Sequence, residues 1–187
     1  MKQFRLLLVR HAPAVDASIC YGRCDVKTHA PPEDYRRLSH TISELSKGKK
    51  TRIWSSPALR CLEVTQKLGF TSPQQDPLLQ ELNFGLWEGI AWKDLEKRED
   101  FTRWMKNWQR ARPPEGETLE EIMHRASSWY KNLKPAEVEV VFTHAGIVRA
   151  LQSILDKKRI QDVMSQKVPH LTPLVWDLPF PIEARCS

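Results

Sequence analysis

Two short apolar runs that each lead into a histidine constrain the fold of this chain more than any other feature. The first run, 6–9, is followed directly by Arg10 and His11. The second run, 138–142, is followed one residue later by His144. Continuous runs of this kind are typical of strands buried on both faces, as in a parallel sheet. We therefore predict a parallel sheet in which both histidines lie at the carboxyl ends of strands.

The placement of the two histidines predicts a ligand crevice. In open α/β sheets, ligands bind outside the carboxyl ends of the strands. Two strands of one sheet would bring His11, His144 and the cationic side chain of Arg10 into one crevice. We expect an anion site there that also contains a nucleophile.

The rest of the chain alternates between strand and helix signals. A strand is predicted at 51–54, and the helix after it is expected to have Ser56 as its N-cap, with Leu59, Leu62 and Leu68 facing inward. The other predicted elements are helices at 33–45, within 91–110, after a capping box at Thr118 and Glu121, and at 146–155, a strand within 171–178, and turn-rich segments at 12–32 and 71–89. This alternation predicts a three-layer α/β/α sandwich with a mostly parallel central sheet.

Length and composition are those of an ordinary globular protein. The 187 residues predict a single domain, 1–187, and 41% of them are hydrophobic and 28% charged. No apolar stretch reaches the roughly 18 residues of a membrane span, and too few apolar residues precede Arg10 for a signal peptide. The four scattered cysteines lack the spacing of a zinc site, so we expect free thiols in a cytoplasmic protein and no metal.

The net charge of +6 is compatible with nucleic acid or with small phosphorylated molecules as partners. The densest basic clusters, 47–50 and 157–159, lie near the ends of predicted elements, where solvated charge is the usual interpretation. No basic helix alternates with aromatic residues, so nucleic-acid binding is not indicated. We expect a small phosphorylated substrate, no membrane partner and no cofactor.

The residues of the predicted crevice suit phosphoryl chemistry. A neutral histidine such as His11 can accept a phosphoryl group and form a reactive, hydrolysable intermediate. Arginine suits the phosphoryl oxygens because its planar fork binds two of them at once. Arg10 is adjacent to His11, and Arg60 lies in the first turn of the helix after 51–54, whose N-terminus adds positive charge. His144 supplies a second imidazole that could donate to a phosphoryl oxygen.

Each of these residues also has a purely structural interpretation. A single histidine at the end of a strand more often forms hydrogen bonds that serve the fold alone. Arg60 by itself would more often be a solvated helix residue. The functional interpretation therefore depends on four such groups meeting at one edge of the sheet.

Five sequence motifs resemble those of the histidine phosphatase superfamily, the phosphoglycerate-mutase-like proteins. In family order they are LVRH at 8–11, SSPALR at 55–60, ELNFGLWEG at 81–89, PEGET at 114–118 and THAG at 143–146. A further loop, YGRCD at 21–25, resembles that of the α-ribazole phosphatase branch. Each motif is weak alone, but their order and their span from residue 6 to about 155 make the combination specific.

The resemblance implies a role for each pocket residue. His11 would be the phosphorylated nucleophile, and Arg10, Arg60 and His144 would form the phosphate pocket. Glu81 would protonate the leaving oxygen and then activate water, because it precedes the glycine-containing turn as the family's general acid does.

Several residues near the implied acid have competing interpretations. Glu81 has apolar neighbours that favour its protonated form. Glu88 is the competing candidate for the acid. The structural alternative for Glu81 is a solvated loop residue. In the candidate substrate loop, Gly22 would let the backbone approach the substrate. Arg23 would either add charge there or lie on the surface.

The chain departs from the family pattern after its first histidine. Ala12 and Pro13 stand where the family usually has glycine and an acidic residue, and Ala12 could narrow the approach of the backbone to phosphate. Ala17 replaces the asparagine that often binds phosphate in the mutases. The missing donor weakens an interpretation as a mutase.

The sequence therefore predicts a metal-independent phosphomonoesterase that acts on a small cytoplasmic phosphate ester through phospho-His11. Among relatives, α-ribazole phosphatase of cobalamin biosynthesis looks nearest, which makes α-ribazole 5'-phosphate a candidate substrate. The alternatives are a sugar-phosphate or protein-phosphohistidine phosphatase. From other classes, the alternative is a non-catalytic module that binds a phosphate ligand or nucleic acid.

Overall fold

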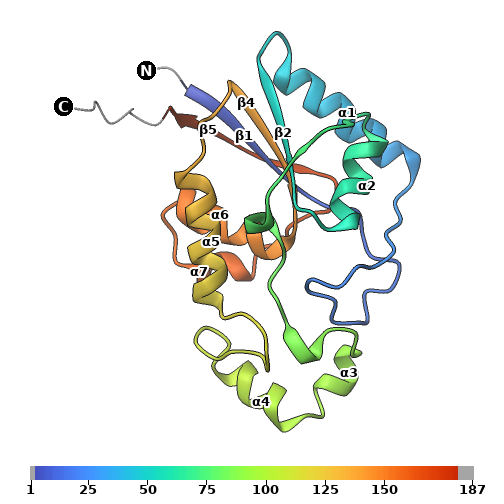
Figure 1. Ribbon diagram of the computed structural model, residues 1–187, viewed down its shortest axis with the longest axis vertical. Coiled ribbons are helices and arrows are strands. Elements are labelled where there is room, and N and C mark those ends of the chain that lie inside the picture. Colours follow the sequence, from blue (N-terminus) through green and yellow to red (C-terminus); the bar gives the residue numbers. More distant parts are fainter. Residues whose placement is uncertain (1–2, 181–187) are drawn as a thin grey trace, which may run out of the picture.

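A five-stranded sheet forms the centre of the computed structural model, which describes residues 3–180 (Figure 1). The strands are β1 (Gln3–Arg10), β2 (Thr51–Ser55), β3 (Gln74–Gln75), β4 (Val138–Thr143) and β5 (Pro173–Pro179). Their order is β3-β2-β4-β1-β5, and every pair is parallel except β1 and β5. The predicted mostly parallel sheet is confirmed.

Helices connect the strands in the expected alternation. They are α1 (Pro32–Ser46), α2 (Leu59–Lys67), α3 (Trp92–Leu95), α4 (Glu99–Lys106), α5 (Leu119–Lys131), α6 (Ala145–Leu155) and α7 (Ile160–Met164), with single 3-10 turns at Pro77–Leu79 and Gly85–Trp87. The predicted capping box of α5 is present, because Thr118 and Glu121 bond each other's backbone N–H groups.

Alternating side chains of β1 build the two cores of the sandwich. Leu6 and Leu8 pack in one cluster with buried residues of α5 and α6. Leu7 and Val9 pack in a second cluster with buried residues of α1 and α2. Since successive side chains of a strand point to opposite faces, the sheet lies between two helical layers. The predicted three-layer sandwich is therefore confirmed.

The register of β1 and β4 places their ends side by side. Arg10 pairs with Thr143, and the backbone N–H of His11 donates to the carbonyl oxygen of Thr143 at 3.0 Å. After this point β1 leads to α1 on one face, and β4 leads to α6 on the other face. The shared end of these two strands is thus the switch point, the position at which doubly wound sheets bind ligands.

Residues 84–111 form a third, separate cluster, which we call the cover. Its buried side chains include Trp87, Leu95 and Phe101, and Trp104 packs against them. In Figure 1, its helices α3 and α4 lie at the end of the molecule remote from β5. The helical region predicted within 91–110 is therefore present as two short helices.

The start of α2 differs from the prediction. Its N-cap is Ala58, not Ser56, and its side chain makes no capping bond. The Ser56 hydroxyl accepts from the backbone N–H of Ala58 at 3.3 Å, just before the helix begins, and also lies 2.9 Å from Nε2 of His144. Leu59 does not face inward as expected, because its position at the first turn leaves it 55% exposed.

Two smaller expectations can be compared with the described residues. No helix within residues 3–180 has both the length and the apolar character needed to span a bilayer. Cys20, Cys24 and Cys61 are free thiols, whereas Cys186 lies outside the described residues.

Candidate active site

His11 lies buried at the end of β1 with its ring held in one tautomer. Its Nδ1 lies 2.6 Å from the carbonyl oxygen of Ala12. A carbonyl only accepts, so Nδ1 carries the proton and Nε2 keeps its lone pair. Burial, and then the charge of Arg60, lower the pKa of His11 to about 3. The ring is therefore neutral at ordinary pH and can act as a nucleophile.

His144 is the second buried imidazole, and its ring centroid lies 5.2 Å from that of His11. Nε of Arg60 donates to its Nδ1 at 3.1 Å, so the proton of His144 is on Nε2, which donates to the Ser56 hydroxyl. Burial and the charge of Arg60 hold the pKa of His144 well below its usual value. The predicted neighbourhood of the two histidines is thus present, and Ser56 is a site residue that sequence reasoning had assigned to a helix cap.

Arg60 is fully buried and joins three parts of the site. Besides its bond to His144, Nη1 donates to the carbonyl of Cys24 at 2.8 Å and Nη2 to that of Gly22 at 2.6 Å. Since a guanidinium has five N–H groups, two remain for a ligand. Arg60 therefore fixes the predicted substrate loop and still offers donors to an anion.

Arg10 has an incomplete set of partners within residues 3–180. Its Nη1 donates to the carbonyl of Val168 at 3.0 Å, while its buried Nε has no hydrogen-bond partner. A buried N–H without a partner is costly, and an anion in the crevice would satisfy it. The α2 N-terminus contributes less than expected, because the N–H of Leu59 already donates to the carboxylate of Asp25 at 3.2 Å.

The carboxylate of Glu81 lies at the start of α6, beside His144. Both of its oxygens lie 3.1 Å from the backbone N of Gly146, and Oε1 also accepts from Leu82 N at 2.9 Å. A side chain at Gly146 would collide with this carboxylate, so only glycine permits the contact. The setting is more polar than the apolar one expected from its neighbours, and it holds Glu81 against the helix that follows the second histidine.

Glu88, the competing acid, is fully used by the backbone of two loops. Its Oε1 accepts from the N–H groups of Arg23 and Phe84 at 2.9 and 3.0 Å, and its Oε2 accepts from Cys24 at 2.9 Å. Gly22 has a φ of +32°, and a side chain there would collide with the same carboxylate. Three backbone N–H groups thus converge on this side chain and fix its position. The Glu88 side chain therefore ties the predicted substrate loop to the turn that begins at Phe84.

An ion pair that sequence reasoning missed holds the backbone around Glu81 in place. Nε and Nη2 of Arg125 donate to the two oxygens of Glu117 at 2.6 and 2.9 Å. The same guanidinium bonds three backbone carbonyls, those of Leu78, Gln80 and Glu81. All five N–H groups of Arg125 are thus used, and the chain that carries Glu81 is fixed on both sides. The pattern of α5 gave no signal for this, because Arg125 is one of several charged residues on the helix.

Arg23 of the candidate substrate loop is only loosely held. Its Nε lies 3.3 Å from the carbonyl of Glu81, and its Nη2 lies 3.4 Å from Glu117. Its side chain is 34% exposed. It therefore borders the site but retains donors that face away from these partners.

His170 is a third imidazole in the site, and the sequence analysis did not single it out. Its ring centroid lies 5.5 Å from that of His11, and its Nδ1 lies 2.6 Å from the carbonyl oxygen of His11. It precedes β5, which runs antiparallel to β1, so the start of β5 meets the end of β1.

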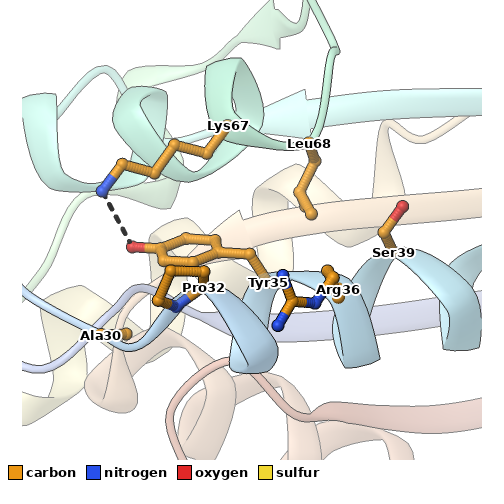
Figure 2. A pocket seen from close by; sticks show the side chains of 7 residues that line it. All are labelled: Ala30, Pro32, Tyr35, Arg36, Ser39, Lys67 and Leu68. Carbon is orange, nitrogen blue, oxygen red and sulfur yellow. Dashed lines mark hydrogen bonds between the residues drawn. The ribbon is translucent and has the colours of Figure 1, made fainter.

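Two other features bear on ligands. Within residues 3–180, no three His, Cys, Asp or Glu side chains are grouped so that they could hold a metal ion. Figure 2 shows a pocket of about 400 Å³ between α1 and α2, where Nζ of Lys67 donates to the hydroxyl of Tyr35 at 3.4 Å. None of its lining residues belongs to the candidate site.

The chain belongs to the histidine phosphatase superfamily (branch 1), whose family model matches residues 6–175. The predicted family is thereby confirmed. A protein of Hydrogenobacter thermophilus described as candidate phosphoserine phosphatase 2 is 30% identical to this chain over 161 residues. These residues cover 81% of this chain and 78% of that protein. A 6-phosphofructo-2-kinase/fructose-2,6-bisphosphatase of Gallus gallus is 25% identical over 73% of this chain, but over only 29% of its own length.

Solved structures of the same fold include the α-ribazole phosphatase from Shigella flexneri. The two chains are 20% identical, with a TM-score of 0.81, over 92% of this chain and 89% of that one. This likeness confirms the fold.

Proposed function

We propose that this protein is a phosphomonoesterase that forms a phosphohistidine on His11. The observation that carries the proposal is the geometry of His11, whose buried ring is held through Nδ1 and whose Nε2 has no hydrogen-bond partner within residues 3–180. Two guanidinium groups with unused N–H donors, those of Arg10 and Arg60, lie beside it. This combination supports attack on a phosphoryl group, whose charged oxygens need such donors.

The proposed reaction has two steps. In the first, Nε2 of His11 attacks phosphorus, the bond from phosphorus to the ester oxygen breaks, and protonated Glu81 gives its proton to the leaving oxygen. In the second, the Glu81 carboxylate takes a proton from water, and the resulting hydroxide displaces His11 from phosphorus. Inorganic phosphate leaves, and both residues return to their starting states.

We further propose that no metal ion takes part. The arginines can balance the phosphoryl charge that a metal would otherwise balance, as preorganised donors do in other active sites. Activity is therefore expected to survive chelating agents. Complete loss on chelation, restored by one divalent ion, would contradict this part of the proposal.

For the substrate, we propose a small phosphate ester, with α-ribazole 5'-phosphate as the first candidate because the 21–25 loop and the fold resemble that branch. Phosphoserine is a second candidate, since the relative of that description is 30% identical. A panel should contain both, together with sugar phosphates, a phosphohistidine peptide and a nucleic-acid binding assay for the non-catalytic alternatives.

The decisive experiment follows the phosphoryl group. Rapid quenching after mixing with a ³²P-labelled ester is expected to trap an acid-labile label on the protein in the presence of chelator. His11→Ala should lose the label and nearly all turnover while keeping its circular dichroism spectrum. His124→Ala, which changes an exposed histidine of α5, is the matched control and should keep both. Near-wild-type activity in His11→Ala would overturn the mechanism.

A further inference from the structure

We propose that His170 is a third catalytic imidazole, whose Nε2 contacts the transferred phosphoryl group. The inference rests on the proposed function, because it assigns a residue to that same site. It goes beyond the set of two histidines, two arginines and one glutamate that the family resemblance implies.

The hydrogen bond at one end of the ring decides what the other end can do. Nδ1 of His170 lies 2.6 Å from the carbonyl oxygen of His11 and must therefore carry a proton. Nε2 of His170 has no hydrogen-bond partner within residues 3–180. It is also not buried, since the buried polar atoms that lack a partner do not include it. The free nitrogen therefore faces an accessible space on the side of the ring away from the His11 backbone.

The backbone around His170 fixes this ring against the nucleophile. The N–H of Leu171 donates to the carbonyl of Arg10 at 3.0 Å, and Nη1 of Arg10 donates to the carbonyl of Val168 at 3.0 Å. The segment is thus tied to Arg10 on both sides of His170. The His170 ring meets the His11 ring at an interplanar angle of 64° and a centroid distance of 5.5 Å. A phosphoryl group on His11 would therefore lie near both the His170 ring and the Arg10 guanidinium.

The charges around His170 make the protonation state of its ring depend on whether an anion is bound. Burial, and then the charge of Arg10, lower the pKa of His170, while its bond to His11 opposes this. His11 is its other titratable neighbour, and Arg60 and His144 in turn lie near His11. A bound phosphoryl dianion would offset the cations and raise the pKa of His170. Nε2 would then take a proton from solvent and donate it to a phosphoryl oxygen.

Two substitutions separate the two ends of the ring. His170→Asn keeps an N–H donor near the position of Nδ1 and removes Nε2, whereas His170→Ala removes both. A hydrogen bond to a charged group corresponds to a loss of about 10- to 100-fold when it is removed. We therefore expect His170→Asn to lower kcat/KM for an aryl phosphate, and the affinity for inorganic phosphate as an inhibitor, by about 10- to 100-fold each. His124→Asn is the control on an exposed histidine.

Proton NMR supplies a readout besides activity. In the wild type, adding inorganic phosphate should move the pKa of His170 upward, and the assignment follows from the resonance that His170→Asn lacks. If His170→Asn binds inorganic phosphate and hydrolyses the aryl ester as the wild type does, the proposed contact is overturned.

The result also separates this inference from the proposed function. If the wild type hydrolyses no ester but phosphate still raises the pKa of His170, the phosphatase proposal fails and the contact stands. If the wild type is an active phosphatase and phosphate leaves the His170 resonance unmoved, the contact fails and the phosphatase proposal stands.

Discussion

The edge of the sheet and the cover differ in how their side chains are held. At the edge, the imidazoles and guanidiniums are bonded to the backbone or to one another, and they come from β1, α2 and the turn before α6. The cover has only two short helices, and its aromatic rings pack mainly on one another. The side chains of the sheet edge are thus held by hydrogen bonds in a fixed geometry, whereas those of the cover are held by packing.

The two regions meet at residues 18–20, which lead directly into the predicted substrate loop at 21–25. The backbone N–H of Cys20 donates to the carbonyl of Ile90 at 2.9 Å, and its carbonyl accepts from the N–H of Gly89 at 2.7 Å. The backbone N–H of Trp92 donates to the carbonyl of Ser18 at 2.8 Å. The same loop is bonded to Arg60 a few residues later. A change in the cover can therefore reach the site through these backbone hydrogen bonds.

Glu81→Gln tests the boundary between the two regions most strongly. General acid catalysis contributes roughly 10²- to 10⁴-fold, and a poor leaving group needs the proton most. We expect a loss of that size in kcat/KM for an alkyl phosphate and a much smaller loss for a nitrophenyl phosphate. Glu88→Gln is the matched comparison and should not discriminate between the two esters. Equal losses on both esters in Glu81→Gln, or selectivity at Glu88 instead, would remove Glu81 from this role.

Arg60→Lys tests whether the edge acts on the phosphoryl group alone. Lysine cannot make the bonds to Gly22, Cys24 and His144 and also present a fork to phosphate. We expect kcat/KM to fall by about 10²-fold on alkyl and aryl esters alike. Arg159→Lys, on the exposed start of α7, is the control and should change neither. A loss confined to one ester would mean that Arg60 senses the leaving group.

Trp104→Ala tests whether the cover opens independently. The indole packs on Phe84, Trp87 and Phe101 and donates to the carbonyl of Ala111 at 3.1 Å. Its loss should speed hydrogen exchange of the α3 and α4 amides by about tenfold or more and leave those of β1 and β4 nearly unchanged. Uniform acceleration across all four elements would show that cover and sheet unfold as one unit.

Acid should destabilise the sheet edge by a smaller and graded amount. His11 is neutral in the fold down to a pKa of about 3, whereas in the unfolded chain it takes up a proton near pH 6.5. Between these values unfolding binds a proton, so stability falls as the pH falls, by up to about 1.4 kcal/mol per pH unit. Urea unfolding at pH 7, 6 and 5 measures this slope. It should be shallower in His11→Asn, and an equal slope would refute the assignment.

Much of the fold and of the candidate site could be predicted because their signals are local. The apolar runs of β1 and β4 each lead into a histidine, and parallel strands of one sheet necessarily end at the same edge. The capping box at Thr118 is equally local, since its two partners lie three residues apart. The N-cap prediction for Ser56 was wrong because α2 begins two residues later than expected, and the Ser56 hydroxyl bonds both the N–H of Ala58 and the distant His144.

The sequence by itself determined the sheet, the pairing of His11 with His144 and the presence of two arginines, because strand periodicity and motif order record these directly. Only the tertiary structure decided three further points. The antiparallel direction of β5 places His170 next to His11. Arg125 bonds the backbone carbonyl of Glu81, and Glu88 bonds the backbone of the predicted substrate loop. Each of these depends on contacts between residues 44 to 159 positions apart. No local pattern encodes such contacts, because they form only when separately specified elements pack together.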